Sequence, residues 1–462
     1  MRDTKSICWT YMTLPAKMGE SATTRIGAGM SATQVQQAGK STSMQKKVLV
    51  GGSIGQFVEF YDFTLYGLSA VILSEYFFPQ GDRITGLLVI FATFGVAFVM
   101  RPLGGLFFGA LGDKVGRRRT LTITIFLVGI CTALIGVLPG FDQIGWVAPI
   151  LLILARLGQG FSAGGESVGG PSFVYEHAPV DRRGLWINIT LAATALPSVF
   201  AGGLILLLST IMSDASFESW GWRIPFLLAL PLSAVGLWIR SRTDESELFK
   251  MTVETRPKEF SPIREAFREN WVGMLQVFFV LGLTALGFYM LSAYFVTYIQ
   301  TAGDLNREQA LLTNAIAMAS YTIFLPIAGH LGDRFGRRPM LIAGSVLLAA
   351  VSMPAFGLVT SGEMGPAFIG QTIFVLALCC YGGGCYTFFC ERFSTRTRFT
   401  SAAISYNVSY AVMGGTAPFV GTWLVDVTGV NTAPGFYMAA CAVVVLALIF
   451  ITRLPETRGR LG

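Results

Sequence analysis

The sequence has little charge and almost no histidine. Only 13% of its 462 residues are charged, whereas soluble domains carry roughly 25% charged residues. It has two histidines, His177 and His330, and no H-E-x-x-H motif, so the ligand pattern of a zinc peptidase is missing. We therefore expect neither an enzyme nor a resident metal or cofactor.

Cysteine is sparse and poorly placed for metal binding. The chain has seven cysteines, and four of them share one apolar segment without a neighbouring histidine: Cys379, Cys380, Cys385 and Cys390. Metal sites combine such thiols at characteristic spacings or with histidine. We interpret these cysteines as small residues at helix contacts.

Hydrophobic residues, by contrast, are abundant and lie in long runs. They make up 53% of the chain, and a run of about twenty is enough for a helix to cross a hydrocarbon core of about 30 Å. The runs predict an all-α membrane protein with twelve spans, near 48–73, 84–108, 120–138, 146–173, 185–211, 222–240, 270–299, 308–329, 339–360, 366–390, 399–424 and 434–453.

Basic residues are concentrated in alternate connections. Those connections hold Lys114 and Arg117–Arg119, Arg182 and Arg183, Arg240–Arg268, Arg334 with Arg337 and Arg338, and Arg392 with Arg396 and Arg398. The opposite connections hold almost only Arg83 and Arg307. The positive-inside rule therefore places both termini in the cytoplasm of a multi-pass inner-membrane protein. It also accounts for the net charge of +7 without a nucleic-acid partner.

The chain is internally duplicated. GALGDKVGRRRTL at 109–121 recurs as GHLGDRFGRRPML at 329–341, in the loop between the second and third spans of each set of six. We expect a disordered cytoplasmic tail, an N-terminal six-helix bundle, a cytoplasmic linker, a C-terminal six-helix bundle and a short cytoplasmic tail, over 1–43, 44–241, 242–269, 270–455 and 456–462.

The repeated loop resembles the signature of the major facilitator superfamily. The resemblance implies the major facilitator fold, two pseudo-symmetric six-helix bundles with a substrate cavity between them. It also implies a conformational latch between the bundles, formed by Asp113, Arg117 and Arg118 and, in the second copy, by Asp333, Arg337 and Arg338. The alternative is that these charges only anchor the loops at the lipid headgroups.

Five further blocks resemble the metabolite:proton symporter family. They lie at 55–67, 91–105, 156–166, 175–184 and 220–226, and include G-x-F-V-E-F-Y-D-F-x-L-Y-G and R-L-G-Q-G-F-S-A-G-G-E. Members of that family take up citrate, 2-oxoglutarate, shikimate, dicarboxylates, proline or betaine together with protons. The blocks alone do not select among these substrates.

Few ionisable residues fall inside the predicted spans, where each costs about 3 kcal/mol or more unless paired. Glu59 and Asp62 share one face of the first span, and Arg101 is expected at the cytoplasmic end of the second. Arg156 is expected deep in the fourth span, with Glu166 further along. We expect Asp62, Glu59 and, less strongly, Glu166 to couple proton movement; a static buried ion pair is the alternative.

The remaining candidates concern the substrate. Arg156 and Arg101 could hold a carboxylate, or Arg156 could be the counter-ion of a proton carrier. The second half offers Tyr289, Tyr381 and Asn407, which suit hydrogen bonds to carboxylates and, for the tyrosines, cation–π contact with a quaternary ammonium. Packing is the simpler explanation for such tyrosines.

If Asp62 and Glu59 carry the proton, Arg156 and, less strongly, Arg101 are the fixed cations left over, and a cavity of net positive character favours an anionic substrate. We therefore expect a monomeric proton symporter for a small organic acid of the di- or tricarboxylate type. The alternatives are proton-coupled uptake of a zwitterionic osmolyte, as for proline or betaine, and an uncoupled facilitator. The expected partners are the substrate, the proton and the lipid bilayer.

Overall fold

The computed structural model describes residues 32–79, 83–115, 117–164, 171, 174, 175, 177–241, 262–393 and 398–459. At some helix ends, including 32–44 and 112–119, the backbone alone is described. The chain divides into two units, Met1–Met44 and Gln45–Gly462, and the account below concerns the second unit. The predicted linker at 242–269 lies mostly outside the described residues, and α1 already begins at Ala32, so the predicted domain limits stay predictions.

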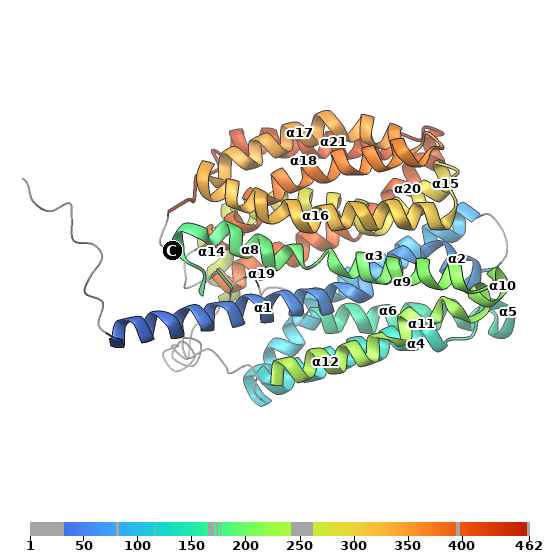
Figure 1. Ribbon diagram of the computed structural model, residues 1–462, viewed down its shortest axis with the longest axis horizontal. Helices are drawn as coiled ribbons and strands as arrows, with labels where there is room; N and C mark the ends of the chain where they lie inside the picture. Colours follow the sequence, from blue (N-terminus) through green and yellow to red (C-terminus); the bar gives the residue numbers. More distant parts are fainter. Residues whose placement is uncertain are drawn as a thin grey trace, which may run out of the picture. The chain divides into compact units, whose positions relative to one another are not determined.

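All regular secondary structure in the described residues of the first half is helical (Figure 1). Its elements are α1 (Ala32–Leu68), α2 (Ala70–Phe77), α3 (Arg83–Val115), α4 (Arg117–Val137), α5 (Phe141–Ile144), α6 (Val147–Ala163), η1 (Val180–Arg182), α8 (Arg183–Ala192), α9 (Leu196–Ile211), α10 (Asp214–Ser216), η2 (Phe217–Gly221), α11 (Arg223–Leu227) and α12 (Ala229–Ser241).

The second half repeats this all-helical design. Its elements are α14 (Pro262–Tyr289), η3 (Met290–Tyr294), α15 (Phe295–Ala302), α16 (Arg307–Phe335), α17 (Arg337–Val359), α18 (Met364–Glu391), α19 (Arg398–Ser409), η4 (Tyr410–Gly414), α20 (Ala417–Thr428) and α21 (Ala433–Ile451). The turns η2, η3 and η4 are π-helical, as is common where a helix is bent near a functional site.

The helices agree with the predicted spans. Within the described residues, nine helices are long and apolar enough to cross a membrane, and a tenth span is formed if α1 and α2, bent by 64°, count as one. Two shorter apolar helices, Thr122–Val137 and Val147–Ala163, fall where the third and fourth spans were predicted. Each of the twelve predicted spans therefore has a helical counterpart.

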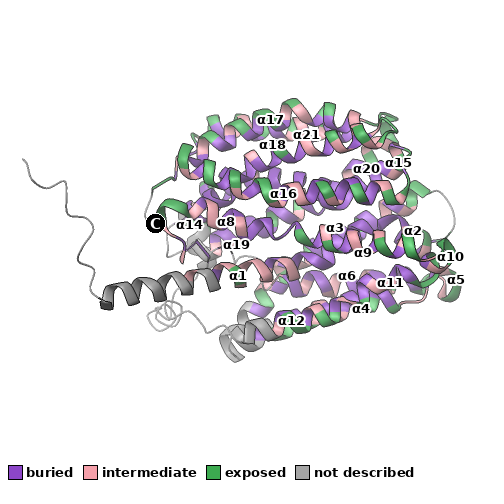
Figure 2. Ribbon diagram, in the orientation of Figure 1, coloured by how far each residue is buried: buried purple, intermediate pink, exposed green. Residues whose placement is uncertain are grey.

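The outer faces of these helices are apolar. Figure 2 shows exposed positions along the outward sides of the helices and buried positions between them. Val99, Leu103 and Leu106 on α3, and Ile323 and Ile327 on α16, are exposed hydrophobic residues of this kind. Surfaces of this composition suit contact with lipid rather than water, since α-helices satisfy their own backbone hydrogen bonds in hydrocarbon.

The crossing of α3 and α6 organises the first half. A Cβ atom added to Gly160 would lie 1.8 Å from the Ala97 carbonyl oxygen, and one added to Gly104 would lie 1.7 Å from that of Phe161. Only glycine permits backbones to approach this closely. The contact holds the middle of α3 against the middle of α6, where Arg101 and Arg156 are found.

The bend between α1 and α2 lies against the other half. A Cβ atom added to Gly67, two residues before the bend at Ser69, would lie 2.5 Å from Ala293 Cβ in the π-turn η3. α16 packs against α8 and α9, and α20 packs against α3, completing the contacts between the halves. The Phe60 ring, next to Glu59 in α1, contacts that of Phe288 in α14 with 5.8 Å between the ring centres, so this part of α1 lies at the contact between the halves.

Candidate functional site

Four ionisable side chains are buried together in the first half. Arg101 and Arg156 are 0% exposed, Asp62 is 2% exposed and Glu59 is 6% exposed. They come from α3, α6 and α1. Charges buried this deeply are costly unless they are paired or bind something charged, so the cluster is the candidate functional site.

Arg156 is held by polar and aromatic neighbours. Its Nη1 donates to Gln159 Oε1 at 2.7 Å, and Gln159 Nε2 donates to Thr132 Oγ1 at 2.8 Å. Its Cζ lies 4.1 Å from the centre of the Tyr66 ring and 5.4 Å from that of Phe94. Arg156 is fully buried in the middle of α6, as predicted, and its Nη1 is occupied, whereas its Nε and Nη2 have no hydrogen-bond partner within the described residues.

Arg101 has no such anchor. Its Cζ lies 4.4 Å from the centre of the Phe63 ring and 4.7 Å from that of Phe98, but its Nε, Nη1 and Nη2 make no hydrogen bond within the described part of the chain. Arg101 lies in the last third of the candidate span Arg83–Phe108, within a helix that continues to Val115, so its predicted position at the cytoplasmic end of the span stays a prediction. Arg101 is therefore the donor most available to an anionic group.

Asp62 faces both arginines. It lies within electrostatic range of Arg156 and Arg101, and Glu59 lies within electrostatic range of Arg101. Neither Asp62 oxygen accepts a hydrogen bond from a described side chain, whereas Glu59 Oε2 accepts one from Gln56 Nε2 at 3.4 Å. With both carboxylates ionised, the two acids balance the two arginines.

Tyrosines of the second half close over this cluster. The Tyr289 ring centre lies 5.1 Å from that of Phe98 and 5.5 Å from that of Phe94, and Tyr289 lies within electrostatic range of Arg101 and Glu59. The rings of Tyr406 and Tyr410 stack at 4.0 Å, and Tyr406 also lies near Glu59 and Arg101. The site thus has a charged wall from one half and an aromatic wall from the other.

The other predicted substrate residues lie differently. Tyr381 donates its hydroxyl to Val280 O at 2.9 Å and so joins α18 to α14 within the second half. Asn407 Nδ2 donates to Ala403 O at 3.0 Å in its own helix, while its Oδ1 has no hydrogen bond within the described residues. Glu166 lies outside the described residues, so its predicted role in proton coupling stays a prediction.

Several residues of the site were not singled out from the sequence. They are Gln159 and Thr132, which hold Arg156, and the rings of Phe63, Tyr66, Phe94 and Phe98, which contact the guanidinium groups. One signal was available, because Gln159 follows Arg156 by three residues and so shares its helix face. Phenylalanines on apolar spans give no comparable signal.

The predicted latch of the second repeat forms a contact between the halves. Asp333 Oδ1 accepts a hydrogen bond from Gly184 N at 2.7 Å, and Oδ2 accepts one from Leu185 N at 2.9 Å. These amides belong to the first turn of α8, where unpaired N–H groups and the helix dipole favour a carboxylate. Arg337 Nη2 lies 3.0 Å from Asp333 Oδ1 and holds it in place.

The end of the chain extends this network. Arg337 Nη2 also lies 3.2 Å from Glu391 Oε1. Glu456 accepts hydrogen bonds from Arg337 N at 2.9 Å and Arg338 N at 3.0 Å. Partial burial raises the pKa of Glu456, but hydrogen bonds from the backbone N–H groups of Arg337, Arg458 and Arg338 outweigh that effect and hold the pKa below its ordinary value.

The first-repeat counterparts of this network cannot be compared. The side chains of Asp113, Arg117 and Arg118 lie outside the described residues. Their predicted part in a latch therefore stays a prediction.

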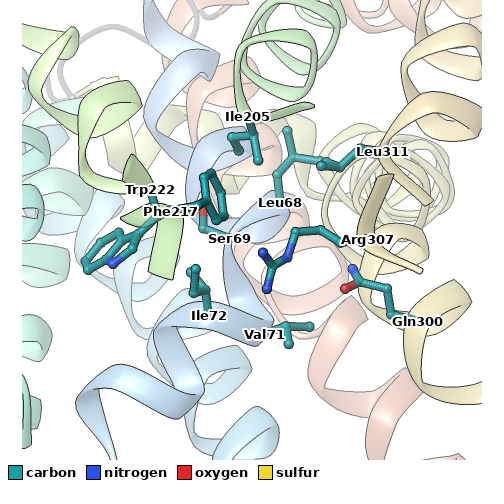
Figure 3. Close-up of a pocket in the computed structure, with 10 residues that line it drawn as sticks. All are labelled: Leu68, Ser69, Val71, Ile72, Ile205, Phe217, Trp222, Gln300, Arg307 and Leu311. Atoms are coloured by element: carbon teal, nitrogen blue, oxygen red, sulfur yellow. The ribbon is translucent and has the colours of Figure 1, made fainter. Parts of the chain in front are cut away.

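A shallow pocket lies at the other end of α16, away from the Asp333 network. Figure 3 shows its lining, which includes Ser69, Phe217, Trp222 and Arg307 and none of the four buried charges. Arg307 Nη2 lies 3.6 Å from Glu218 Oε1 across the two halves. The halves therefore touch at both ends, and the charged cluster is enclosed between these contacts.

The described residues contain no group of three or more His, Cys, Asp or Glu side chains placed to hold a metal ion. Cys385, from the cysteine-rich segment, accepts a hydrogen bond from Thr284 Oγ1 at 3.2 Å and is buried. It is one of the small residues at a helix contact.

Comparison with known proteins gives a consistent family and fold. Residues 48–461 match the model of the family described as sugar (and other) transporters. A proline/betaine transporter of Escherichia coli is 36% identical over 427 residues, covering 90% of this chain and 84% of the relative. A glycine betaine/proline/ectoine/pipecolic acid transporter of Dickeya dadantii is 35% identical, covering 86% of this chain and 81% of the relative.

Solved structures show the fold. The xylose transporter XylE of Escherichia coli, in a partially occluded inward open conformation, superposes with a TM-score of 0.71 at 18% identity. The match covers 91% of this chain and 100% of that structure.

These relatives correct the predicted substrate. They are transporters of proline and betaines, so the prediction of a di- or tricarboxylate symporter is wrong and its alternative, a zwitterionic osmolyte, is favoured. The error lies in treating Arg101 and Arg156 as unneutralised cations. The structure places Asp62 and Glu59 within electrostatic range of them, so with both carboxylates ionised the site has no excess of positive charge to attract an anion.

Proposed function

The chain belongs to the family of sugar and other transporters of the major facilitator superfamily, and we propose that it is a proton-coupled symporter for a zwitterionic osmolyte of the proline and betaine type. The observation that carries this proposal is the presence of both charge signs, together with aromatic rings, in one enclosed site. A zwitterion pairs with both signs. A dicarboxylate would be repelled by Asp62 and Glu59 in a region of weak screening.

The carboxylate of the substrate is assigned to Arg101. Its three guanidinium nitrogens have no hydrogen-bond partner within the described residues, and a planar guanidinium can bind a carboxylate through two parallel hydrogen bonds. Arg156 is a weaker candidate because Gln159 already occupies its Nη1 and only Nε and Nη2 have no partner within the described residues. Arg156 instead keeps the local charge balanced beside Asp62.

The ammonium end of the substrate is assigned to the buried tyrosines of the second half. Tyr289, Tyr406 and Tyr410 are buried, and they approach the charged cluster from the second half. A quaternary ammonium cannot donate a hydrogen bond, but it binds to aromatic faces and to nearby carboxylates. A substrate bridging Arg101 and these tyrosines would contact both halves at once, as alternating access requires.

The proton is assigned to Asp62. This carboxylate is buried and receives no hydrogen bond from a described side chain, so protonation breaks no such bond. Protonation of Asp62 leaves a net positive charge on the site, which strengthens binding of the substrate carboxylate. Proton and substrate would then bind cooperatively, because each increases the affinity for the other.

The contacts at the two ends of the molecule are assigned to alternating closure. Asp333 at the start of α8 closes the end that the distribution of basic residues places in the cytoplasm. Because a helix N-terminus holds a carboxylate through short-range interactions, a small displacement of the halves breaks this contact. Asp333 and Arg337 would thus act as the latch, in a bacterial inner membrane with both termini cytoplasmic.

The proposal is tested with purified protein in proteoliposomes. Radiolabelled glycine betaine, proline, citrate and 2-oxoglutarate are offered in parallel, with an inward proton gradient and after its collapse by a protonophore. We expect gradient-dependent accumulation of glycine betaine or proline only. Uptake of the acids alone would refute the substrate class, and osmolyte uptake that ignores the protonophore would make the protein a facilitator.

A further inference from the structure

The pocket shown in Figure 3 contains binding groups that the central site does not use. Its walls come from both halves and are mainly apolar, and the guanidinium of Arg307 points from α16 toward first-half side chains. Arg307 is at the opposite end of α16 from Asp333. The pocket therefore lies at the end assigned to the outside of the cell.

Two polar side chains of this pocket, Arg307 and Trp222, are weakly engaged. Arg307 is 27% exposed, and its partner Glu218 is 58% exposed and 3.6 Å away, a separation too long for a good hydrogen bond. Its Cζ lies 5.0 Å from the centre of the Phe217 ring. Trp222, which also lines the pocket, is almost fully buried, yet its indole N–H has no hydrogen-bond partner within the described residues.

We propose that this pocket is an outer binding site at which Arg307 receives the carboxylate of the substrate before the substrate reaches Arg101. The inference rests on the proposed function. In this conformation the cavity has a volume of only about 20 Å³, enough for a single water. The incoming carboxylate therefore displaces Glu218 from Arg307 first, and the rings of Phe217 and Trp222 cover the apolar body of the substrate once the halves have moved apart at this end. The indole N–H of Trp222 turns toward the bound carboxylate and donates a second hydrogen bond to it.

The exchange of partners at Arg307 is favourable for two reasons. An exposed ion pair without good hydrogen-bond geometry contributes little to stability, so displacing Glu218 costs little. Glu218 belongs to the first half and Arg307 to the second, so a substrate on Arg307 also removes a contact that holds the halves together. Binding at the outer site would therefore promote opening at this end.

Two substitutions distinguish substrate binding by Arg307 from a purely structural role of the Arg307–Glu218 ion pair. Each substitution removes the ion pair, but they differ in their effect on the substrate. Arg307→Gln removes the carboxylate anchor, whereas Glu218→Gln removes only its competitor. In right-side-out membrane vesicles, we expect Arg307→Gln to raise the KM for glycine betaine uptake roughly tenfold, the loss of one charged hydrogen bond. We expect Glu218→Gln to lower that KM, and Arg307→Lys to restore most of the affinity.

Controls make the outcomes distinct. The KM for efflux should change little in Arg307→Gln, since substrate arriving from the other face meets Arg101 first. The amount of transporter in the vesicles is quantified for every variant. Equal shifts in KM for Arg307→Gln and Glu218→Gln, or no shift in either, would overturn the outer site. Absence of osmolyte uptake by the unmodified protein would instead refute the proposed function and this inference with it.

Discussion

The difference between the two buried arginines leads to a quantitative prediction. Arg101 has three guanidinium nitrogens without hydrogen bonds in the described structure, whereas Arg156 is tied to Gln159 at 2.7 Å. Replacing each by lysine keeps the charge but removes the planar fork that binds a carboxylate at two points. The two substitutions are chemically identical, so each is a matched control for the other.

The expected magnitude follows from the number of hydrogen bonds lost. Lysine at 101 can retain one of the two charged hydrogen bonds to the substrate, so Arg101→Lys should cost about 2 kcal/mol of binding free energy. That loss corresponds to a roughly 30-fold rise in the KM for glycine betaine. Arg156→Lys breaks the bond to Gln159 instead, so we expect a fall in the melting temperature and a rise in KM of no more than about threefold.

The assay is counterflow of labelled glycine betaine in proteoliposomes, with the melting temperature of each purified variant measured beside it. Counterflow does not require a proton gradient, so it reports substrate affinity even in a variant with altered coupling. An unchanged KM in Arg101→Lys, or a larger KM change in Arg156→Lys, would refute the assignment of the substrate carboxylate to Arg101.

Three further predictions concern coupling, closure and stability. Asp62→Asn should retain glycine betaine exchange and lose accumulation driven by a proton gradient, because the amide cannot carry the proton; full accumulation would exclude Asp62 as the carrier. Gly184→Ala should open the end of the molecule that Asp333 closes, because the added Cβ would lie 2.5 Å from Gly329 O and 2.6 Å from Asp333 Oδ1. A cysteine introduced near this contact should then react faster with a thiol reagent. An unchanged labelling rate would argue against the latch. Glu456→Gln should lower stability by about 1 kcal/mol at neutral pH, the screened value of its charged hydrogen bonds. The folded-state pKa of Glu456 is depressed. Its contribution to stability is therefore complete above the unfolded-state pKa of about 4.3 and is lost as the pH falls through the folded-state pKa. The unfolding curves of the two proteins should thus converge in acid, and a stability difference that is constant with pH would contradict this explanation.

The number and position of the helices could be predicted from the sequence because they depend on local properties. A segment in hydrocarbon must be apolar and must satisfy its own backbone hydrogen bonds, so its length and hydropathy identify it without knowledge of its neighbours. The duplicated loop, which contains Asp113 and Asp333, similarly marks the two halves. The rarity of charge within spans was enough to select Asp62, Glu59 and Arg156.

The tertiary structure decided which of these groups meet. Arg101 and Arg156 come together through the glycine crossing of α3 and α6, and Tyr289 reaches Arg101 from the other half, at separations in sequence that no local pattern encodes. The contact between Asp333 and the start of α8 is likewise long-range.

What the sequence by itself determined is therefore an all-α membrane transporter with two related halves and a short set of buried ionisable residues. The substrate class depended on the tertiary structure and on the relatives, because it depends on the sum of charges within a few ångströms. Counted along the chain, Arg101 and Arg156 suggested an excess of positive charge. In the folded protein Asp62 and Glu59 neutralise them, and an enclosed site of balanced charge with aromatic walls is suited to a zwitterion.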